Sequence, residues 1–186
     1  MPETYTKVAI TLHWLIGIAI IAMLVMGVML EDIPDEYKFI AYQTHKSIGL
    51  TILILSFVRL FWRLSHRAPA LPATMAKWEI IVSKITHVAF YVLMIGLPLS
   101  GWALVSASPR NIPTLWFGVF EWPHLPILSD VVDKKGVSDS FAELHESLAN
   151  ITIALLALHI GGALKHHFIA KDEVLSRMIP FLKRKI

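Results

Sequence analysis

Histidines are the residues in this sequence whose type and spacing indicate chemistry. The chain contains nine of them, and two, His145 and His159, stand at the ends of the apolar stretch HESLANITIALLALH. An imidazole can ligate a metal ion or carry a proton near neutral pH. The absence of cysteine excludes thiolate metal sites, Fe–S clusters, covalently attached c-type haem and disulfides. Any redox chemistry must therefore come from a cofactor that is held by other ligands.

Four long apolar segments must position these histidines. The chain is 55% hydrophobic and its mean hydropathy is +0.61, so it is more apolar than a soluble all-α domain of this size. Each segment holds about 18 to 24 mostly apolar residues, enough to cross a bilayer as a helix. We predict an all-α membrane protein, one domain over residues 1–186, that forms an antiparallel four-helix transmembrane bundle. The expected spans are 10–30, 47–64, 82–105 and 147–169.

The first of these segments could be mistaken for a secretory signal because it begins so close to the N-terminus. It is too long for the apolar core of a signal peptide, and the sequence EDIPDEYK follows it in place of a small-residue cleavage site. We therefore expect it to be retained as a membrane span.

Loop charges predict the orientation of the bundle. With four spans, both termini and the loop between the second and third spans share one side, which carries twelve Lys and Arg against four Asp and Glu. The opposite side carries five basic against ten acidic residues. Lys and Arg accumulate in cytoplasmic loops, so we expect both termini to be cytoplasmic in a bacterial inner membrane. The basic balance is thus a topology signal, and nucleic acid is not an expected partner.

The alternating direction of the spans places the histidines at two depths. His45 and His145 fall at the outer ends of the second and fourth spans. His159 lies fourteen residues after His145, hence about 21 Å deeper on nearly the same helix face. Its partner at that inner level is His13 or, failing that, His87. Two levels, each with a facing pair of imidazoles, fit two stacked haems whose irons are held between helices.

Glycines on these spans would allow a flat macrocycle to approach the helix backbones. Gly17 and Gly49 each follow a candidate ligand by four residues, so each lies on the same helix face as that ligand. Gly27 and Gly101 lie at the outer level, on the helix faces that point inward at the inner level. Closer packing of the helices is the alternative explanation for all four glycines.

Two further groups near the inner level could serve a cofactor or a substrate. Arg59 lies fourteen residues after His45, inside a span, where an ionisable side chain is costly and usually faces the interior. A haem propionate or a quinone head group would be its partner; snorkelling to the interface is the alternative. His166 and His167 follow His159 by about two turns, and form either an interfacial cap or part of a quinone pocket. An imidazole there could hydrogen-bond a quinone oxygen and supply a proton.

Two other kinds of histidine chemistry fit the sequence less well. A catalytic zinc helix would carry His at positions i and i+4, and the sequence shows no such pair. A proton or ion transporter would need carboxylates at mid-membrane depth. The carboxylates nearest to the spans, Glu31, Glu143 and Glu146, all fall at the outer edge.

Five motifs resemble those of the bacterial cytochrome b561 family. They occur in the family's order and with similar spacing, and together they extend along essentially the whole chain. The motifs are ITLHW (10–14), THKSIG (44–49), ITHVAFYVLMIGLPLSG (85–101), LHESLAN (144–150) and LHIGGALKHHFIAKD (158–172).

The resemblance implies a four-helix bundle that encloses two b-type haems. It implies that His13 and His159 ligate the haem iron on the cytoplasmic side. It implies that His45 and His145 do so on the periplasmic side. It thereby favours His13 over His87, and it leaves His87 as a supporting or quinone-side residue.

The resemblance also implies an activity. The best-defined activity in the family is that of superoxide oxidase, which takes electrons from periplasmic superoxide and delivers them to ubiquinone at the cytoplasmic side. The family's quinone contact corresponds to His166. We therefore expect a superoxide:ubiquinone oxidoreductase embedded in the membrane lipid. A related branch supplies cytochrome b subunits of hydrogenases and formate dehydrogenases, so the alternative is an electron-transfer subunit that links a periplasmic or membrane protein partner to quinone.

The charge of the outer side differs from what a superoxide oxidase should show. Positive potential at the entrance would raise the encounter rate with an anion, yet acidic residues outnumber basic ones two to one on this side. A local anion entrance would require the five outer basic residues to converge. These are Lys38, Lys46, Arg110, Lys134 and Lys135.

The long outer loop, 106–143, is expected to turn at Pro109, Pro113 and Pro123. An aromatic cluster in it would be the surface for a protein partner, or would lie against the membrane and cover the outer haem. The cluster comprises Trp116, Phe117, Phe120 and Trp122.

Overall fold

The computed structural model describes residues 4–72 and 74–182. Glu3, Lys183, Arg184 and Lys185, which contribute to the charge balance above, lie outside the described residues. Most of the chain forms four long helices. These are α1 (Lys7–Met29), α2 (Asp35–Ser65), α3 (Lys77–Ala107) and α5 (Lys134–Lys165), and α5 continues into the π-helical turn η1 (His166–Ala170).

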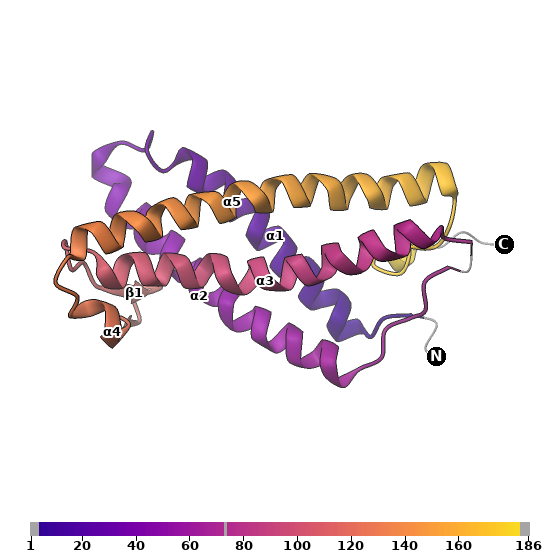
Figure 1. Ribbon diagram of the computed structural model, residues 1–186, viewed down its shortest axis with the longest axis horizontal. Coiled ribbons are helices and arrows are strands. Elements are labelled where there is room, and N and C mark those ends of the chain that lie inside the picture. The colour runs from indigo at the N-terminus through magenta and orange to yellow at the C-terminus, as the bar shows by residue number, and fades with distance from the viewer. Residues whose placement is uncertain (1–3, 73, 183–186) are drawn as a thin grey trace.

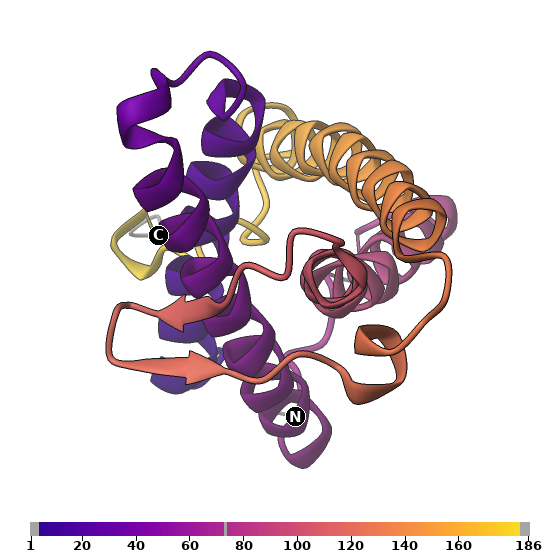
Figure 2. The same cartoon turned by 90° about the vertical axis from the view of Figure 1, so that its left-hand side faces the viewer.

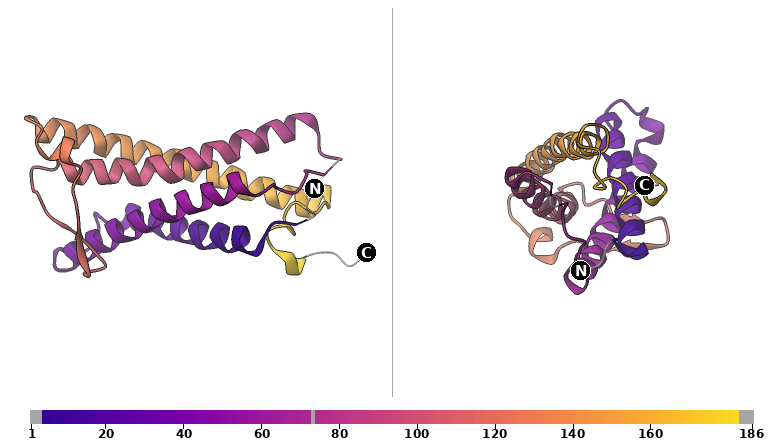
Figure 3. Two further views of the ribbon diagram at one scale, coloured as in Figure 1. Left: turned by 90° about the horizontal axis from the view of Figure 1, so that it is seen from below. Right: turned by 90° about the vertical axis from the view of Figure 1, so that its right-hand side faces the viewer.

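The four long helices form an antiparallel bundle, as predicted. Figure 1 shows that α1 begins at the same end of the molecule at which α5 finishes. The packed pairs are α1 with α2, α2 with α3, and α3 with α5. Seen from below, α3 and α5 lie on one side, and α1 and α2 lie on the other (Figure 3).

The outward faces of the bundle are apolar. Each long helix, with η1 counted in the last, contains an 18-residue window of mean hydropathy between 1.6 and 2.5, of which at most 28% is buried. Val28, Phe61 and Leu158 are each more than 70% exposed. Helices with apolar exposed faces and internally satisfied backbones are suited to lipid. The four long helices are thus long and apolar enough to cross a membrane.

Local signals explain where the helices begin. The Thr6 hydroxyl accepts a hydrogen bond from the N–H of Ala9 at 3.2 Å and caps α1. Pro34 precedes α2, whose first turn carries Asp35 and Glu36 at the positive end of the helix dipole. At the start of α3, the Glu79 carboxylate accepts from the N–H of Ala76 at 3.1 Å.

Two helices begin well before the apolar stretches in the sequence. α2 begins at Asp35 and α5 at Lys134, in both cases about a dozen residues before the apolar run. A helix of 31 residues is about 46 Å long, which exceeds the hydrocarbon core of about 30 Å. The outer ends of these helices therefore extend beyond the hydrocarbon core, and the outer histidines lie close to its boundary.

The outer loop has structure that the sequence did not predict. It contains two short antiparallel strands, β1 (Thr114–Trp116) and β2 (Phe120–Trp122), with Leu115 opposite Glu121. The turn between them has positive φ at Phe117 and Gly118, as a tight hairpin requires. A single helical turn, α4 (Pro126–Ser129), follows. Figure 2 shows the hairpin lying across α2 at the outer end.

Polar side chains of α2 hold this hairpin in place. The Gln43 amide donates to the Pro113 carbonyl at 2.8 Å and accepts from the N–H of Leu115 at 2.9 Å. The Ser47 hydroxyl, which is buried, contacts the carbonyl of Leu115 and the N–H of Phe117. The loop is therefore a fixed cover on the outer end of the bundle.

At the inner end, residues after η1 fold back against the bundle. The indole N–H of Trp14 donates to the Met178 carbonyl at 2.8 Å, which ties this segment to α1. The Arg177 guanidinium donates to the carbonyl of Ala70 in the linker between α2 and α3. The segment thus joins three parts of the chain at the inner end.

Candidate cofactor sites at two levels of the bundle

The outer level brings His45 of α2 to His145 of α5. Their ring centroids are 6.2 Å apart and the ring planes are inclined by 68°. Two imidazoles that bind one metal ion from opposite sides, with metal–nitrogen bonds of about 2 Å, have centroids about 6 Å apart. The pair therefore has room for one ion between the rings.

The protein fixes the orientation of His145. Its Nδ1 lies 3.0 Å from the carbonyl oxygen of Leu97 and 3.0 Å from the hydroxyl of Ser100. A proton on Nδ1 that is donated to the carbonyl leaves the lone pair on Nε2, the arrangement usual for a metal-ligating histidine. Neither Leu97 nor Ser100 was singled out by the sequence, because the contact joins residues more than forty positions apart.

Two glycines contact the outer imidazoles. A Cβ atom at Gly101 would lie 3.0 Å from Cε1 of His145, and one at Gly27 would lie 3.8 Å from Cε1 of His45. Only glycine at position 101 leaves the His145 ring undisturbed. His45 has a buried Nδ1 without a hydrogen-bond partner among the described residues, a costly state that a bound group would relieve.

The inner level brings three histidines together. The ring centroid of His159 lies 6.1 Å from that of His13 and 6.1 Å from that of His87. Phe90 packs edge-on against the His159 ring at 5.2 Å. Ring spacing alone therefore keeps both candidates open for the partner of His159, as in the sequence.

Hydrogen bonding distinguishes His13 from His87. Nη2 of Arg59 lies 3.1 Å from Nδ1 of His13, and because a guanidinium can only donate, this nitrogen is an acceptor here. An imidazole that ligates through Nε2 carries its proton on Nδ1. Binding of His13 to a metal ion thus requires Arg59 to turn to another partner. Nδ1 of His87 lies 3.4 Å from the Ser83 hydroxyl, whose oxygen can accept a hydrogen bond from the N–H of the ring.

Gly17 and Gly49, which each follow a candidate ligand by four residues, differ in their surroundings. Among the described residues, no atom lies within 4 Å of a Cβ built at Gly17, which leaves free space at the inner level four residues from His13. A Cβ at Gly49 would meet the end of the flexible Met23 side chain at 3.9 Å. Gly17 thus has the open surroundings that a flat cofactor needs, whereas Gly49 faces a side chain.

An apolar layer separates the two levels. Ile16, Ile52 and Met94, from three different helices, form the buried centre of this layer. Side chains of this kind offer neither protons nor hydrogen bonds, so the layer is a barrier to water between the two levels.

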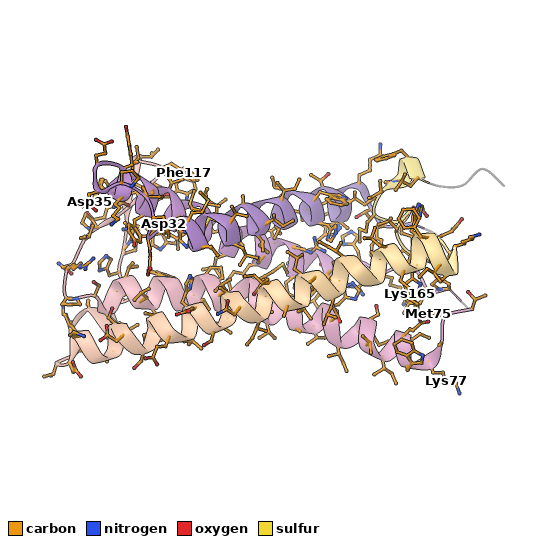
Figure 4. The ribbon with its side chains drawn as sticks, turned by 90° about the horizontal axis from the view of Figure 1, so that it is seen from above. Asp32, Asp35, Met75, Lys77, Phe117 and Lys165 are labelled. Carbon is orange, nitrogen blue, oxygen red and sulfur yellow. The ribbon has the colours of Figure 1, made fainter. Side chains whose placement is uncertain are left out.

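Charged and titratable groups gather at the inner end of α5. His166 Nδ1 lies 2.6 Å from Oδ2 of Asp172, and both side chains are largely buried. Lys165 forms an ion pair with Glu79 of α3 and lies over the Trp78 ring. Figure 4 shows Lys165 near Met75 and Lys77 at one end of the molecule, with Asp32, Asp35 and Phe117 at the other.

Asp172 is a residue that the sequence reasoning missed. Its position six residues after His166 gives no helical contact by itself, because a regular helix would place the two residues on different faces. His167, the neighbour of His166, packs against Phe168 with ring centroids 4.8 Å apart.

Three of the five outer basic residues are engaged at separate places. Lys38 pairs with Asp35 at 2.8 Å, and Lys135 pairs with Asp139 at 2.6 Å. Lys46 donates to the carbonyl of Pro113 at 2.9 Å and helps to hold the hairpin. These three side chains do not converge on an anion entrance.

The four-helix architecture agrees with a comparison of sequences. A family profile described as prokaryotic cytochrome b561 matches residues 4–181. The chain belongs to this family. Membership implies the binding of haem b and electron transfer in the membrane, and the residues of the two levels fit such a cofactor in type and spacing.

Curated proteins from several bacteria are similar over almost the whole chain. Cytochrome b561 homolog 2 of Escherichia coli is 29% identical over 180 residues, which cover 96% of this chain and 92% of the relative. A probable superoxide oxidase CybB of Yersinia pestis is 27% identical over 180 residues, or 97% of this chain and 98% of the relative. Cytochrome b562 of Cereibacter sphaeroides is 25% identical over 181 residues, or 94% of both chains.

Proposed function

We propose that this cytochrome b561 binds two haems and transfers electrons from periplasmic superoxide to ubiquinone. His45 and His145 would hold the outer haem, and His13 and His159 the inner one. The observation that carries the proposal is the presence of imidazole pairs at two levels, with ring centroids 6.2 Å and 6.1 Å apart. Bound haem b supplies reversible one-electron chemistry that no side chain here can provide.

The residues of the chain would perform the remaining tasks. Leu97 and Ser100 orient His145, and the layer around Ile16 excludes water between the two levels. Arg59 would leave His13 and neutralise a carboxylate of the inner haem. His166 would contact ubiquinone at the inner end, with His87 on the same side of the bundle.

The charge asymmetry of the loops supports an orientation in the inner membrane with both termini in the cytoplasm. The outer level would then face the periplasm, where superoxide would arrive. The inner level would face the cytoplasm, from which the protons for quinone reduction would come.

The alternative function is an electron-transfer subunit that links a periplasmic or membrane protein partner to quinone. The separate positions of the outer basic residues favour this alternative. Lys38, Lys46 and Lys135 each have a different partner, so they do not form a positively charged entrance for an anion. Similarity to a probable superoxide oxidase favours the leading proposal. The electron donor is therefore the point that an experiment must test.

A visible spectrum of the oxidised, purified protein before and after a pulse of superoxide is that experiment, with ubiquinone added afterwards. We expect reduction of the haems within milliseconds and reoxidation by ubiquinone. His145→Ala should abolish the fast reduction, whereas His66→Ala, which removes an exposed histidine beyond the end of α2, should not. If superoxide leaves the haems oxidised while dithionite and ubiquinone cycle them normally, the leading proposal fails and the alternative replaces it.

A further inference from the structure

We propose that Asp172 is a positioning residue that aims His166 as the proton donor to ubiquinone. The inference rests on the proposed reduction of ubiquinone at the inner end and adds a residue to that site. The feature behind it is a histidine–carboxylate pair, with Nδ1 of His166 and Oδ2 of Asp172 2.6 Å apart and both side chains 12% exposed.

Asp172 is fixed at three points. Its Oδ2 meets the imidazole, and its Oδ1 accepts a hydrogen bond from the N–H of Val174 at 3.0 Å. Its own N–H donates to the carbonyl oxygen of His166 at 3.2 Å. The carboxylate therefore has little freedom to rotate, and the imidazole that is bonded to it takes a defined orientation.

The backbone that brings these residues together departs from regular helix. α5 widens into the π-helical turn η1 from His166 to Ala170, and Lys171 then adopts the left-handed region with φ of 56°. π-helical turns are rare and are often found at functional sites. A left-handed conformation at a residue other than glycine is also uncommon. Two unusual local conformations in succession thus serve to return Asp172 to His166.

The chemistry follows from which nitrogen the carboxylate occupies. With the proton of Nδ1 donated to Asp172, Nε2 is the nitrogen that remains for a ligand. In the neutral ring Nε2 can only accept a hydrogen bond, so donation to a quinone oxygen requires the doubly protonated imidazolium. A carboxylate in contact with the ring stabilises that form through a charge-assisted hydrogen bond.

The reaction balances with two electrons and two protons for each ubiquinone. Two superoxide ions each give up one electron and become O2. His166 passes a proton from Nε2 to a quinone oxygen and becomes neutral. It then takes a proton from cytoplasmic water and passes this second proton to the singly protonated quinone. Ubiquinol leaves, and the imidazole is recharged from water.

The neighbouring charged side chains have other partners or are exposed, and Asp172 is the carboxylate that pairs with His166. Glu79 of α3 forms its ion pair with Lys165 of α5. The ion pair of Asp172 is with His166 itself. Lys171 is next to Asp172 in the chain, and its side chain is exposed.

The test follows reoxidation of dithionite-reduced holoprotein by a soluble ubiquinone analogue as a function of pH. In the wild type, the rate should fall as the pH rises and the imidazolium is lost. Asp172→Asn should make reoxidation roughly tenfold slower on the alkaline side, because the charge-assisted hydrogen bond to the ring is lost. Asp172→Glu should restore most of the rate. Glu173→Gln, which removes an exposed carboxylate next along the chain, should behave as the wild type.

A second readout is independent of turnover. Nitrogen NMR of protein labelled in the histidine rings, with His166→Gln to assign the signal, reports the protonation of His166 directly. The proposal predicts that the His166 signal shows a ring whose Nδ1 is hydrogen-bonded to a carboxylate, and that Asp172→Asn removes this signature.

Three results would overturn the inference. The first is an unchanged His166 signal in Asp172→Asn, and the second is an equal loss of rate at every pH without rescue by Asp172→Glu. The third is wild-type reoxidation in His166→Gln. This last result, combined with the expected NMR shift, would show that the pair exists but that ubiquinone is reduced elsewhere, so that the fault lies in the proposed quinone site.

Discussion

Nη2 of Arg59 lies 3.1 Å from Nδ1 of His13, inside the bundle and at the level of His159. This contact places a permanent positive charge at the inner level. The side chain does not snorkel to the interface, which was the alternative offered by the sequence. A haem bound at the inner level would therefore gain its electron close to this positive charge.

Arg59→Gln should lower the reduction potential of the inner haem, because the charge of Arg59 stabilises the form that has gained an electron. A unit charge at about 10 Å is worth about 1 to 2 kcal/mol at an effective dielectric constant near 20, which is about 40 to 80 mV for one electron. A spectroelectrochemical titration measures both haems, and the outer potential is the internal control. Equal potentials in the variant and the wild type would show that Arg59 is screened or points away in the holoprotein.

His13 and His87 can be distinguished as partners of His159 by haem content. His13→Ala should lose the inner haem and keep the outer one, whereas His87→Ala should keep both, because His87 is expected to act only beside the inner site. Pyridine haemochrome assays on matched preparations give the number of haems per chain. The opposite pattern would transfer the ligand role to His87, whose Nδ1 already has an acceptor in Ser83.

Gly101→Ala should weaken the outer haem selectively. The new Cβ would lie 3.0 Å from Cε1 of His145 and would displace the imidazole, so we expect haem affinity at this level to fall roughly tenfold or more. Gly96→Ala on the same helix is the matched control, since its Cβ would meet only Leu148 Cδ1 at 4.0 Å. Titration of haem into apoprotein measures both variants, and equal affinities would contradict the role given to His145.

Gln43→Ala should release the outer hairpin. The substitution removes the bonds to Pro113 and Leu115 from a buried position, at a cost of about 1 to 3 kcal/mol. Protease cleavage within 114–122 should accelerate, and dithionite should reduce the outer haem faster. Tyr42→Ala, at an exposed neighbouring position, should change neither rate. If protease cleaves the hairpin of Gln43→Ala as slowly as that of the wild type, the bonds from Ser47 and Lys46 suffice to hold it.

Much of the bundle could be predicted because the relevant information is local. Apolar length indicates the helices, and helical periodicity together with alternating direction places His45 and His145 at one level. Their role as iron ligands stays a prediction. The choice between His13 and His87 could not be made from depth, because the ring centroids of both lie 6.1 Å from that of His159.

Features that depend on distant or irregular contacts were missed. The outer hairpin has strands of only three residues, and its position is set by Gln43 and Ser47 some seventy residues earlier. Asp172 reaches His166 through a π-helical turn and a left-handed Lys171, neither of which has a recognisable sequence pattern. The ion pairs of Lys38 with Asp35 and of Lys135 with Asp139 are local, three and four residues apart, but a count of charges on one side does not contain them.

The segment that folds back at the inner end also has a consequence for biogenesis. Its bonds from Trp14 to Met178 and from Arg177 to Ala70 join early parts of the chain to a late one. A ribosome adds about 5 to 20 residues per second, so α1 through α3 emerge several seconds before Met178 is made. During that interval neither of these two hydrogen bonds can form. The inner end of the bundle is therefore joined last, after α5 with His159 has been made.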